Sequence, residues 1–181
     1  MSITVIEIGG HTQHPVGKKL SNFQARPFLF DGIKCGGMEG LLQALKCPDR
    51  ERQVEICALS GREAKMAGRK FDSWKDKQIL SFLGDTFSRC SRGYLVFITR
   101  VYDTLYHQDP TLKDDLLSLG SAQIWHSIGN PNSEDRDSGA VTVFYILYFL
   151  FGRHIMFIFI FIKRSASDWL IVRIYNHSTM Y

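Results

Sequence analysis

The stretch GGMEGLLQALK, residues 36–46, carries the strongest structural pattern in the chain. Its apolar side chains recur three and four residues apart, a spacing that places them on one face of an α-helix: Met38, Leu41, Leu42 and Leu45. With that face in the core, Glu39, Gln43 and Lys46 form a separate row along the helix. The sequence therefore predicts an amphipathic helix whose polar edge carries a carboxylate, an amide and an ammonium group.

This polar row has two interpretations. On spacing alone, it is a solvated helix face whose charge pair contributes roughly 0.3 kcal/mol to stability. Gly36 and Gly37 precede the row and favour a ligand site, because glycines let the backbone approach a ligand closely at a helix start. A helix start also favours an anion such as a phosphate.

The block before this helix, SNFQARPFLFDG at residues 21–32, combines polar and aromatic side chains. Residues 27–30 are expected to be extended, and the Asp31–Gly32 pair is typical of a tight turn. The simpler interpretation of this block is a turn followed by a strand with an aromatic core, since Phe is usually buried. Asn22 and Arg26 would bring polar groups close to the helix in sequence.

The rest of the chain is expected to add short helices to a few short strands. Residues 3–8 alternate apolar and polar side chains, as a strand does. Cap residues and apolar spacing predict helices at 49–59, 60–68, 72–83 and 109–117. Nothing in the chain repeats. The predicted fold class is α+β, a single domain dominated by helices.

Residues 141–162 differ from everything before them, because they are almost entirely Phe, Ile, Leu, Tyr and Val. Three interpretations are open: a membrane segment, a tail that was never selected to pack in this fold, or buried strand or helix. Arg153 and His154 argue against a span, since a charge inside a membrane is costly and each apolar half is too short to cross alone.

Composition excludes several classes of function. The net charge of +4 comes from 22 basic and 18 acidic residues that are interspersed, which is too mild for a nucleic-acid-binding surface. The four cysteines have no metal-ligand spacing, so we expect reduced thiols, no metal site and no cofactor. The first residues lack the order of a secretory signal, and a cytoplasmic protein is expected.

Four blocks taken in order resemble the NADAR (YbiA-like) family of N-glycosidases: SNFQARPFLFDG, GGMEGLLQALK, AKMAGRKFDSW and HQDPTLKDDLLSLGSAQIWHSIGN. The similarity covers about residues 20–130, and the first two blocks are its most specific part. The resemblance implies a YbiA-like fold and cleavage of N-glycosidic bonds. Substrates in that family are phosphorylated intermediates of riboflavin synthesis or ADP-ribose attached to guanine, free or in nucleic acid.

The resemblance also implies site residues. Glu39 matches the active-site glutamate of the family, and Gln43 and Lys46 follow it in register. The remaining matches are implied substrate-binding residues: Asn22, Phe23 and Trp74. The chemistry of these groups agrees, because a carboxylate can stabilise an oxocarbenium-like state and activate water, while an ammonium can neutralise a phosphate.

The chain also departs from the family pattern. Met38 and Gly40 flank Glu39 where the family has polar residues, so hydrogen bonds around the carboxylate are expected to be missing. Residues 84–101 are expected to be an insertion, within a domain at 1–135 that is followed by a divergent apolar tail at 136–181. An alternative to the enzyme is therefore a catalytically silent ligand-binding or interaction protein, with membrane association through the tail as a further option.

Overall fold

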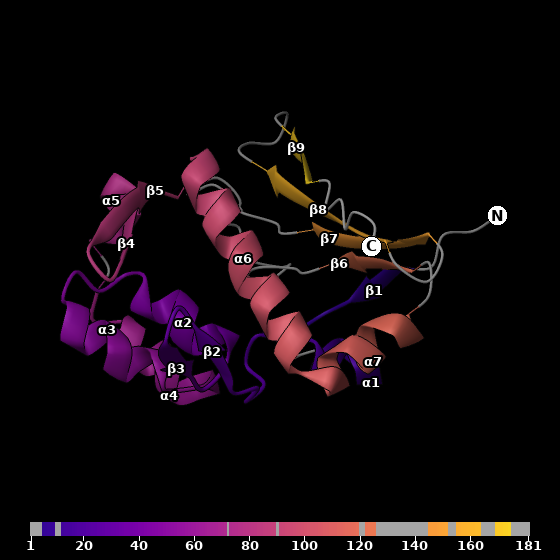
Figure 1. Ribbon diagram of the computed structural model, residues 1–181, viewed down its shortest axis with the longest axis horizontal. Coiled ribbons are helices and arrows are strands. Elements are labelled where there is room, and N and C mark those ends of the chain that lie inside the picture. Colours follow the sequence, from indigo (N-terminus) through magenta and orange to yellow (C-terminus); the bar gives the residue numbers. More distant parts are fainter. Residues whose placement is uncertain are drawn as a thin grey trace. The chain divides into compact units, whose positions relative to one another are not determined.

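The computed structural model describes residues 5–9, 12–71, 73–89, 91–119, 122–125, 145–151, 155–163 and 169–174. These residues form an α+β fold of short helices and short strands (Figure 1), as the sequence predicts. The chain divides into two compact units. The central unit is Ser21–Asp114, and the terminal unit joins Met1–Leu20 with Asp115–Tyr181.

The central unit begins with a hairpin of strands β2 (Phe28–Phe30) and β3 (Ile33–Cys35), which are antiparallel. Asp31 and Gly32 connect them with φ angles of 46° and 80°, the left-handed conformation that a two-residue hairpin turn requires. Phe28 and Phe30 are buried while Leu29 between them is exposed, as expected for a strand with one face in a core. The predicted turn and strand are therefore confirmed.

Helix α2 (Met38–Ala44) follows and packs against α3 (Arg50–Cys57) and α4 (Gly61–Gly68). The approach to the C-terminal end of α3 is close, since a Cβ atom on Gly40 would lie 2.7 Å from the carbonyl oxygen of Cys57 and 2.2 Å from that of Leu59, just after the helix. Asp49 caps α3 by accepting a 2.7 Å hydrogen bond from the Arg52 N–H, as predicted. Ser60 begins α4 at the predicted place, without a side-chain capping bond.

The predicted helix at residues 72–83 is wrong. Only α5 (Trp74–Lys77) is helical, and the chain then forms an antiparallel hairpin of β4 (Ile79–Phe82) and β5 (Asp85–Ser88). Leu83 and Gly84 make its turn with φ angles of 51° and 106°. Burial alternates along β4, which is the period of a strand. Asp72, the expected helix cap, lies outside the described residues.

Helix α6 (Arg92–Gln108) occupies a stretch for which no helix is predicted from the sequence. Ser91 caps it by accepting a 3.1 Å hydrogen bond from the Tyr94 N–H. The helix packs on β2 and β5, and its buried residues form one stripe: Tyr94, Leu95, Ile98, Val101 and Leu105. An aromatic cluster joins it to both hairpins, and its rings are those of Phe30, Phe82, Phe87 and Phe97.

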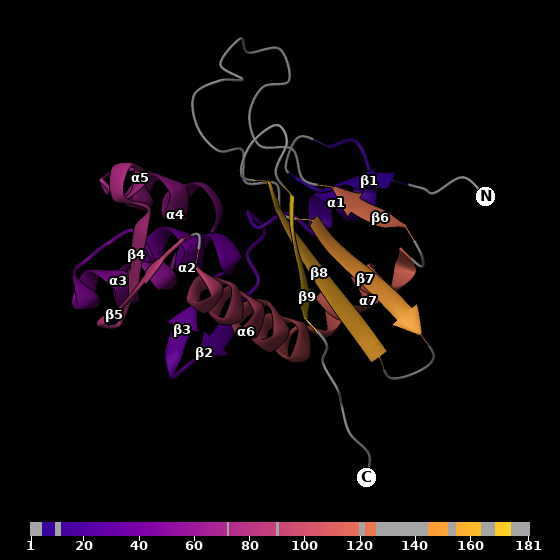
Figure 2. The same ribbon diagram turned by 90° about the horizontal axis from the view of Figure 1, so that it is seen from above.

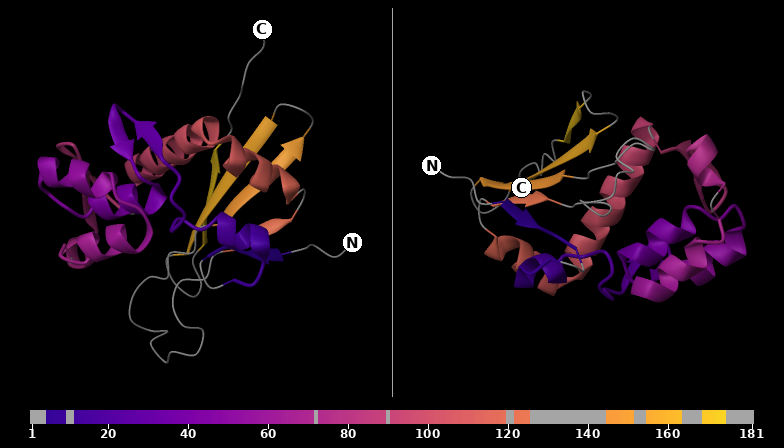
Figure 3. Two further views of the ribbon diagram at one scale, coloured as in Figure 1. Left: turned by 90° about the horizontal axis from the view of Figure 1, so that it is seen from below. Right: turned by 180° about the vertical axis from the view of Figure 1, so that it is seen from behind.

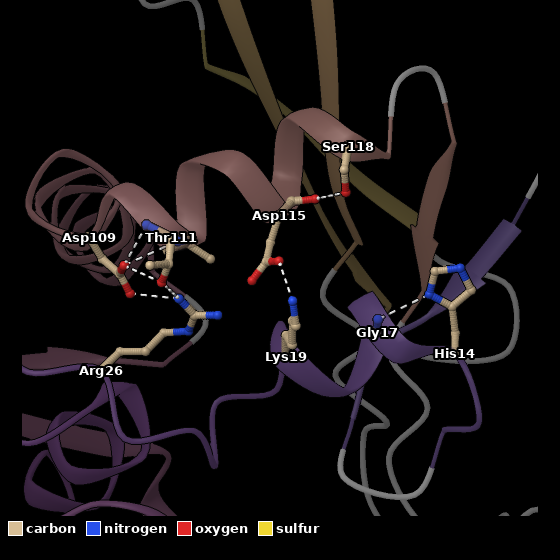
Figure 4. A network of polar contacts seen from close by, with 9 residues as sticks. His14, Gly17, Lys19, Arg26, Asp109, Thr111, Asp115 and Ser118 are labelled. Carbon is tan, nitrogen blue, oxygen red and sulfur yellow. Dashed lines mark hydrogen bonds and ion pairs between the residues drawn. The ribbon is translucent and has the colours of Figure 1, made fainter.

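The C-terminal end of α6 and the residues that follow it hold β2 and the segment that leads into it. The Gln108 amide donates a 2.8 Å hydrogen bond to the Leu29 carbonyl and accepts one of 2.8 Å from the Leu29 N–H. Arg26 donates to Asp109 at 2.6 Å and to Thr111 at 3.0 Å (Figure 4). Asp109 also stands at the start of α7 (Pro110–Ser118), the helix that the Asp-Pro pair predicts.

The terminal unit pairs two segments that are far apart in the sequence. Strand β1 (Val5–Glu7) runs parallel to β6 (Gln123–Trp125). Helix α1 (Pro15–Lys19) begins at His14, whose Nδ1 accepts a 3.1 Å hydrogen bond from the Gly17 N–H. The strand expected at residues 3–8 is confirmed in its described part.

Three strands follow near the C-terminus: β7 (Tyr145–Phe151), β8 (Ile155–Lys163) and β9 (Trp169–Ile174). They form one antiparallel sheet with β8 in the middle (Figures 2 and 3). The apolar tail is therefore extended wherever it is described. None of the helices within the described ranges is long and apolar enough to cross a membrane. The predicted boundary at residue 135 lies outside those ranges.

Candidate functional site

The carboxylate expected to be catalytic lies in the first turn of α2. Glu39 is buried, with 7% of its surface exposed, so it does not belong to a solvated helix face. Its backbone N–H donates a 3.2 Å hydrogen bond to the carbonyl oxygen of Asn22. Two of the residues singled out in the sequence are thus brought together by the backbone alone.

The polar row predicted from residues 36–46 exists as a connected chain of hydrogen bonds. The Gln43 Nε2 donates to Glu39 Oε1 at 2.7 Å, and the Lys46 Nζ donates to Gln43 Oε1 at 2.6 Å. The amide therefore faces its NH₂ group to the acid and its oxygen to the amine. Gln43 is itself 8% exposed, so the row is held in a largely buried environment.

Helix α4 leaves room for this row only because it carries a glycine at its last position. A Cβ atom on Gly68 would lie 2.0 Å from Gln43 Oε1 and 2.7 Å from Gln43 Cβ. Any larger residue would push the amide away from its two partners. The position of Gln43 thus depends on a neighbouring helix as well as on its own.

Trp74 adjoins the amine end of the row. The Lys46 Nζ lies 5.3 Å from the centre of the indole ring, and the Arg89 guanidinium lies 5.1 Å from the same ring. Both distances fit cation–π contacts. The indole Nε1 is buried without a hydrogen-bond partner among the described residues. Trp74 is the residue expected at this site, whereas nothing in the sequence analysis singled out Arg89.

Tyr102 is a second residue of the site that the sequence analysis missed. Its hydroxyl, on α6, donates a 3.1 Å hydrogen bond to the Asn22 Oδ1. Burial raises the pKa of Tyr102, the hydrogen bond to Asn22 opposes that rise, and the nearby Glu39 carboxylate adds to it. The phenol is therefore a neutral donor at ordinary pH, close to the buried acid. The signal that could have found it is its spacing, four residues after the buried Ile98 on the same helix.

Phe23 is the one expected site residue that the contacts leave aside. It is 40% exposed, and Lys65 lies 5.2 Å from its ring. No hydrogen bond, ion pair or ring contact within the described part of the chain links Phe23 to Glu39 or Lys46. The other expected residues converge: Asn22, Glu39, Gln43, Lys46 and Trp74.

The site has opposite charges at its two ends. The described residues form no ion pair with the Glu39 carboxylate, which accepts a hydrogen bond from the Gln43 amide. At the other end, Lys46 and Arg89 lie against one indole ring. A buried carboxylate can stabilise a positive charge that develops beside it, and paired cations can hold an anion.

Comparisons with known proteins give a family and a fold. The family described as bacteriophage protein GP30.3 matches residues 14–144. A protein of Enterobacteria phage T4, described as an uncharacterized 17.1 kDa protein in the Gp30-rIII intergenic region, is 37% identical over 116 residues. That match covers 64% of this chain and 76% of the phage T4 protein.

Among solved structures, the NMR structure of the E. coli protein YbiA is similar, with a TM-score of 0.52 and 19% sequence identity. The match covers 76% of this chain and 75% of YbiA. At this level of identity the likeness concerns the fold, and it confirms the expected YbiA-like architecture.

Proposed function

The chain belongs to the bacteriophage protein GP30.3 family and has a YbiA-like fold, and from this premise we propose that it is an N-glycosidase. Its substrate would carry a nitrogen base on the anomeric carbon of a phosphorylated ribose. ADP-ribosylated guanine and a phosphoribosyl intermediate of riboflavin synthesis are the two substrates to test.

Glu39 would act at the anomeric carbon. The C–N bond breaks and its electron pair leaves on the base nitrogen, which gives the ribose an oxocarbenium-like charge that a carboxylate stabilises. The oxygen of a water molecule then bonds to the anomeric carbon, and its proton passes by way of Glu39 to the released base. The reaction needs no other reactant than water.

The burial of Glu39 is the observation that carries this proposal. Electrostatic attraction is stronger away from bulk water, so a carboxylate that is 7% exposed stabilises a developing cation better than a solvated one. Its hydrogen bond from Gln43 fixes its direction without neutralising its charge. Both features are expected of a group that must remain anionic and oriented during the reaction.

The remaining residues would bind the substrate. Asn22, held by Tyr102 at 3.1 Å, can hydrogen-bond a hydroxyl or carbonyl group. Trp74 can stack on a base, and Lys46 can neutralise a phosphate. A role of Phe23 in substrate binding stays a prediction from the family pattern, because the contacts described above do not test it.

Substitution of the acid tests the proposal directly. Glu39→Gln should reduce base release on the order of 10²-fold or more, because it removes the charge and keeps the shape. The measurement is chromatographic detection of free guanine or of the released base and ribose phosphate. Glu51→Gln is the matched control, since Glu51 stands in the first turn of α3 and is exposed. Equal turnover of Glu39→Gln and the unsubstituted protein would refute the proposal.

A ligand-binding protein without turnover is the second candidate, and one observation favours it. The residues on either side of Glu39 supply no polar side chain, since Met38 is a buried apolar residue and Gly40 packs against the Leu59 carbonyl. A second group to orient the attacking water is then lacking at these positions. Binding of ADP-ribose by calorimetry, combined with no base release from either substrate, would identify this function.

A further inference from the structure

Arg89 occupies a fixed place beside Trp74. It follows directly after β5, and its backbone N–H donates a 2.8 Å hydrogen bond to the Gln78 carbonyl, which fastens the end of the β4–β5 hairpin. Its guanidinium lies 5.1 Å from the centre of the indole ring. A guanidinium placed on an aromatic ring keeps N–H groups at its edge for a ligand.

Helix α6 supports the same side chain from another direction. Burial raises the pKa of the Tyr94 phenol, and the nearby positive charge of Arg89 opposes that rise. Tyr94 is buried in the stripe of α6 that faces the hairpins. The end of the β4–β5 hairpin and the Trp74 ring thus determine where the positive charge is held. A side chain placed in this way loses little conformational entropy when it binds a ligand.

Two cationic side chains at one indole ring can bind an anion. Lys46 and Arg89 lie 5.3 Å and 5.1 Å from one indole ring, so two positive charges share a single aromatic partner. Within the ranges that the structure describes, no carboxylate forms an ion pair with Arg89. A phosphate that contacts both side chains would form charge-assisted hydrogen bonds with them.

We propose that Arg89 and Lys46 together bind the phosphate attached to the ribose of the substrate. Arg89 lies beside Trp74 and Tyr94. The inference rests on the proposed function for the identity of the sugar. The row of side chains runs from Glu39 through Gln43 to Lys46 and ends at this cationic pair. A phosphorylated ribose fits both ends of this row. Its anomeric carbon develops a positive charge that Glu39 can stabilise, and its phosphate can contact the two cations. Arg89 is then a specificity-determining residue that selects phosphorylated over free ribosides.

Calorimetric titration of the full chain with ribose 5-phosphate, ADP-ribose and free ribose tests the inference. Arg89→Gln is expected to weaken binding of both phosphorylated ligands by about tenfold or more and to leave the affinity for ribose unchanged. Arg89→Lys should retain part of the affinity, since it keeps the charge and loses the planar fork. Arg92→Gln is the matched control because Arg92 is a nearby exposed arginine on α6, and it should bind like the unsubstituted chain.

Circular dichroism and thermal melting of each variant establish that the fold is retained. The inference is overturned when Arg89→Gln, folded as the unsubstituted chain is, binds ribose 5-phosphate equally well, or when it loses affinity for ribose to the same extent. It is also overturned when the unsubstituted chain shows no preference for ribose 5-phosphate over ribose.

These readouts separate the inference from the enzymatic proposal. Absence of base release with selective, Arg89-dependent binding refutes the glycosidase and supports the phosphate site. Base release with an unchanged KM in Arg89→Gln supports the glycosidase and refutes the phosphate site.

Discussion

At the scale of single residues, Tyr102 shows how a buried hydroxyl can position a polar side chain for ligand binding. It reaches Asn22 from α6, whereas the backbone of Asn22 is joined to the first turn of α2. Asn22 is therefore held from two elements, α2 and α6, and Tyr102 of α6 lies 80 residues after it in the chain. Tyr102 is a positioning residue, because its contact is with Asn22.

Tyr102→Phe keeps the ring and removes this hydrogen bond. We expect a loss of about 1 kcal/mol in the free energy of unfolding, which is the usual contribution of one such bond. We also expect KM for the ribosyl substrate to rise and kcat to change less, since the acid is left in place. Chemical denaturation and steady-state kinetics measure the two effects. A reduced stability with an unchanged KM would show that Tyr102 acts on the fold alone.

At the scale of elements, the close packing of α4 on α2 makes Gly68 sensitive to substitution. Gly68→Ala should displace Gln43, lower the free energy of unfolding by about 1–3 kcal/mol through overpacking and reduce base release. Gly93→Ala is the control, because the nearest atom to its added Cβ would be the Ser91 Oγ at 3.5 Å. In the exposed first turn of α6, that alanine should be neutral or stabilising. Thermal melting of the two variants side by side would contradict this account if both behaved alike.

The elements that could be predicted are those with a local signal. Asp31–Gly32 predicts its hairpin because both positions need a positive φ angle, and Asp49 predicts the start of α3 because its side chain accepts a backbone N–H. The spacing of residues 36–46 predicts both α2 and the row from Glu39 to Lys46. Each of these depends on residues within a few positions of one another.

The elements that could not be predicted depend on tertiary contacts. Ile79 and Phe82 are three residues apart, which is the spacing of one helix face. In the structure Leu80 and Phe82 are the buried pair, and packing of Phe82 in the aromatic cluster selects the strand. The stripe of α6 was obscured by polar neighbours such as Arg100, which pairs with Asp31 at the surface. Arg89 and Tyr102 could not be predicted as site residues either, because each acts through residues that are distant in sequence.

At the scale of the whole molecule, two buried or half-buried groups are expected to shape the dependence of stability on pH. Burial opposes ionisation of Asp109, but hydrogen bonds from Thr111 and Arg26 outweigh it and lower the pKa of this carboxyl. A lowered pKa in the folded state means that the stabilisation is present above the ordinary value of 3.8 and is lost as pH falls through the folded value.

Asp109→Asn keeps an oxygen for the cap of α7 and removes the charge that Arg26 contacts. We expect this variant to be less stable than the unsubstituted chain at neutral pH by about 1 kcal/mol, with the difference vanishing as the pH falls through the lowered pKa of Asp109. Urea denaturation across that range measures it. A difference that stayed constant with pH would show that the charge of Asp109 is not the source of the stabilisation.

The same reasoning applies with opposite sign to Tyr102, whose pKa is raised mainly by burial. The folded state favours the protonated phenol, so this contribution is present below the ordinary value of 10.0 and is lost as pH rises above it. The advantage of the unsubstituted chain over Tyr102→Phe should therefore shrink in alkali. The molecule is expected to be most stable between these two limits.

The sheet of β2 and β3 has two strands, so the side of β2 that faces away from β3 has backbone N–H and C=O groups that are not paired with a strand. Such groups can pair with a strand of another molecule, which is the first step of many aggregation reactions. The Gln108 side chain occupies both groups of Leu29, as a partner strand would. One glutamine at the end of a helix thereby makes this sheet edge a poor template for self-association, although the Leu29 side chain beside it remains half exposed.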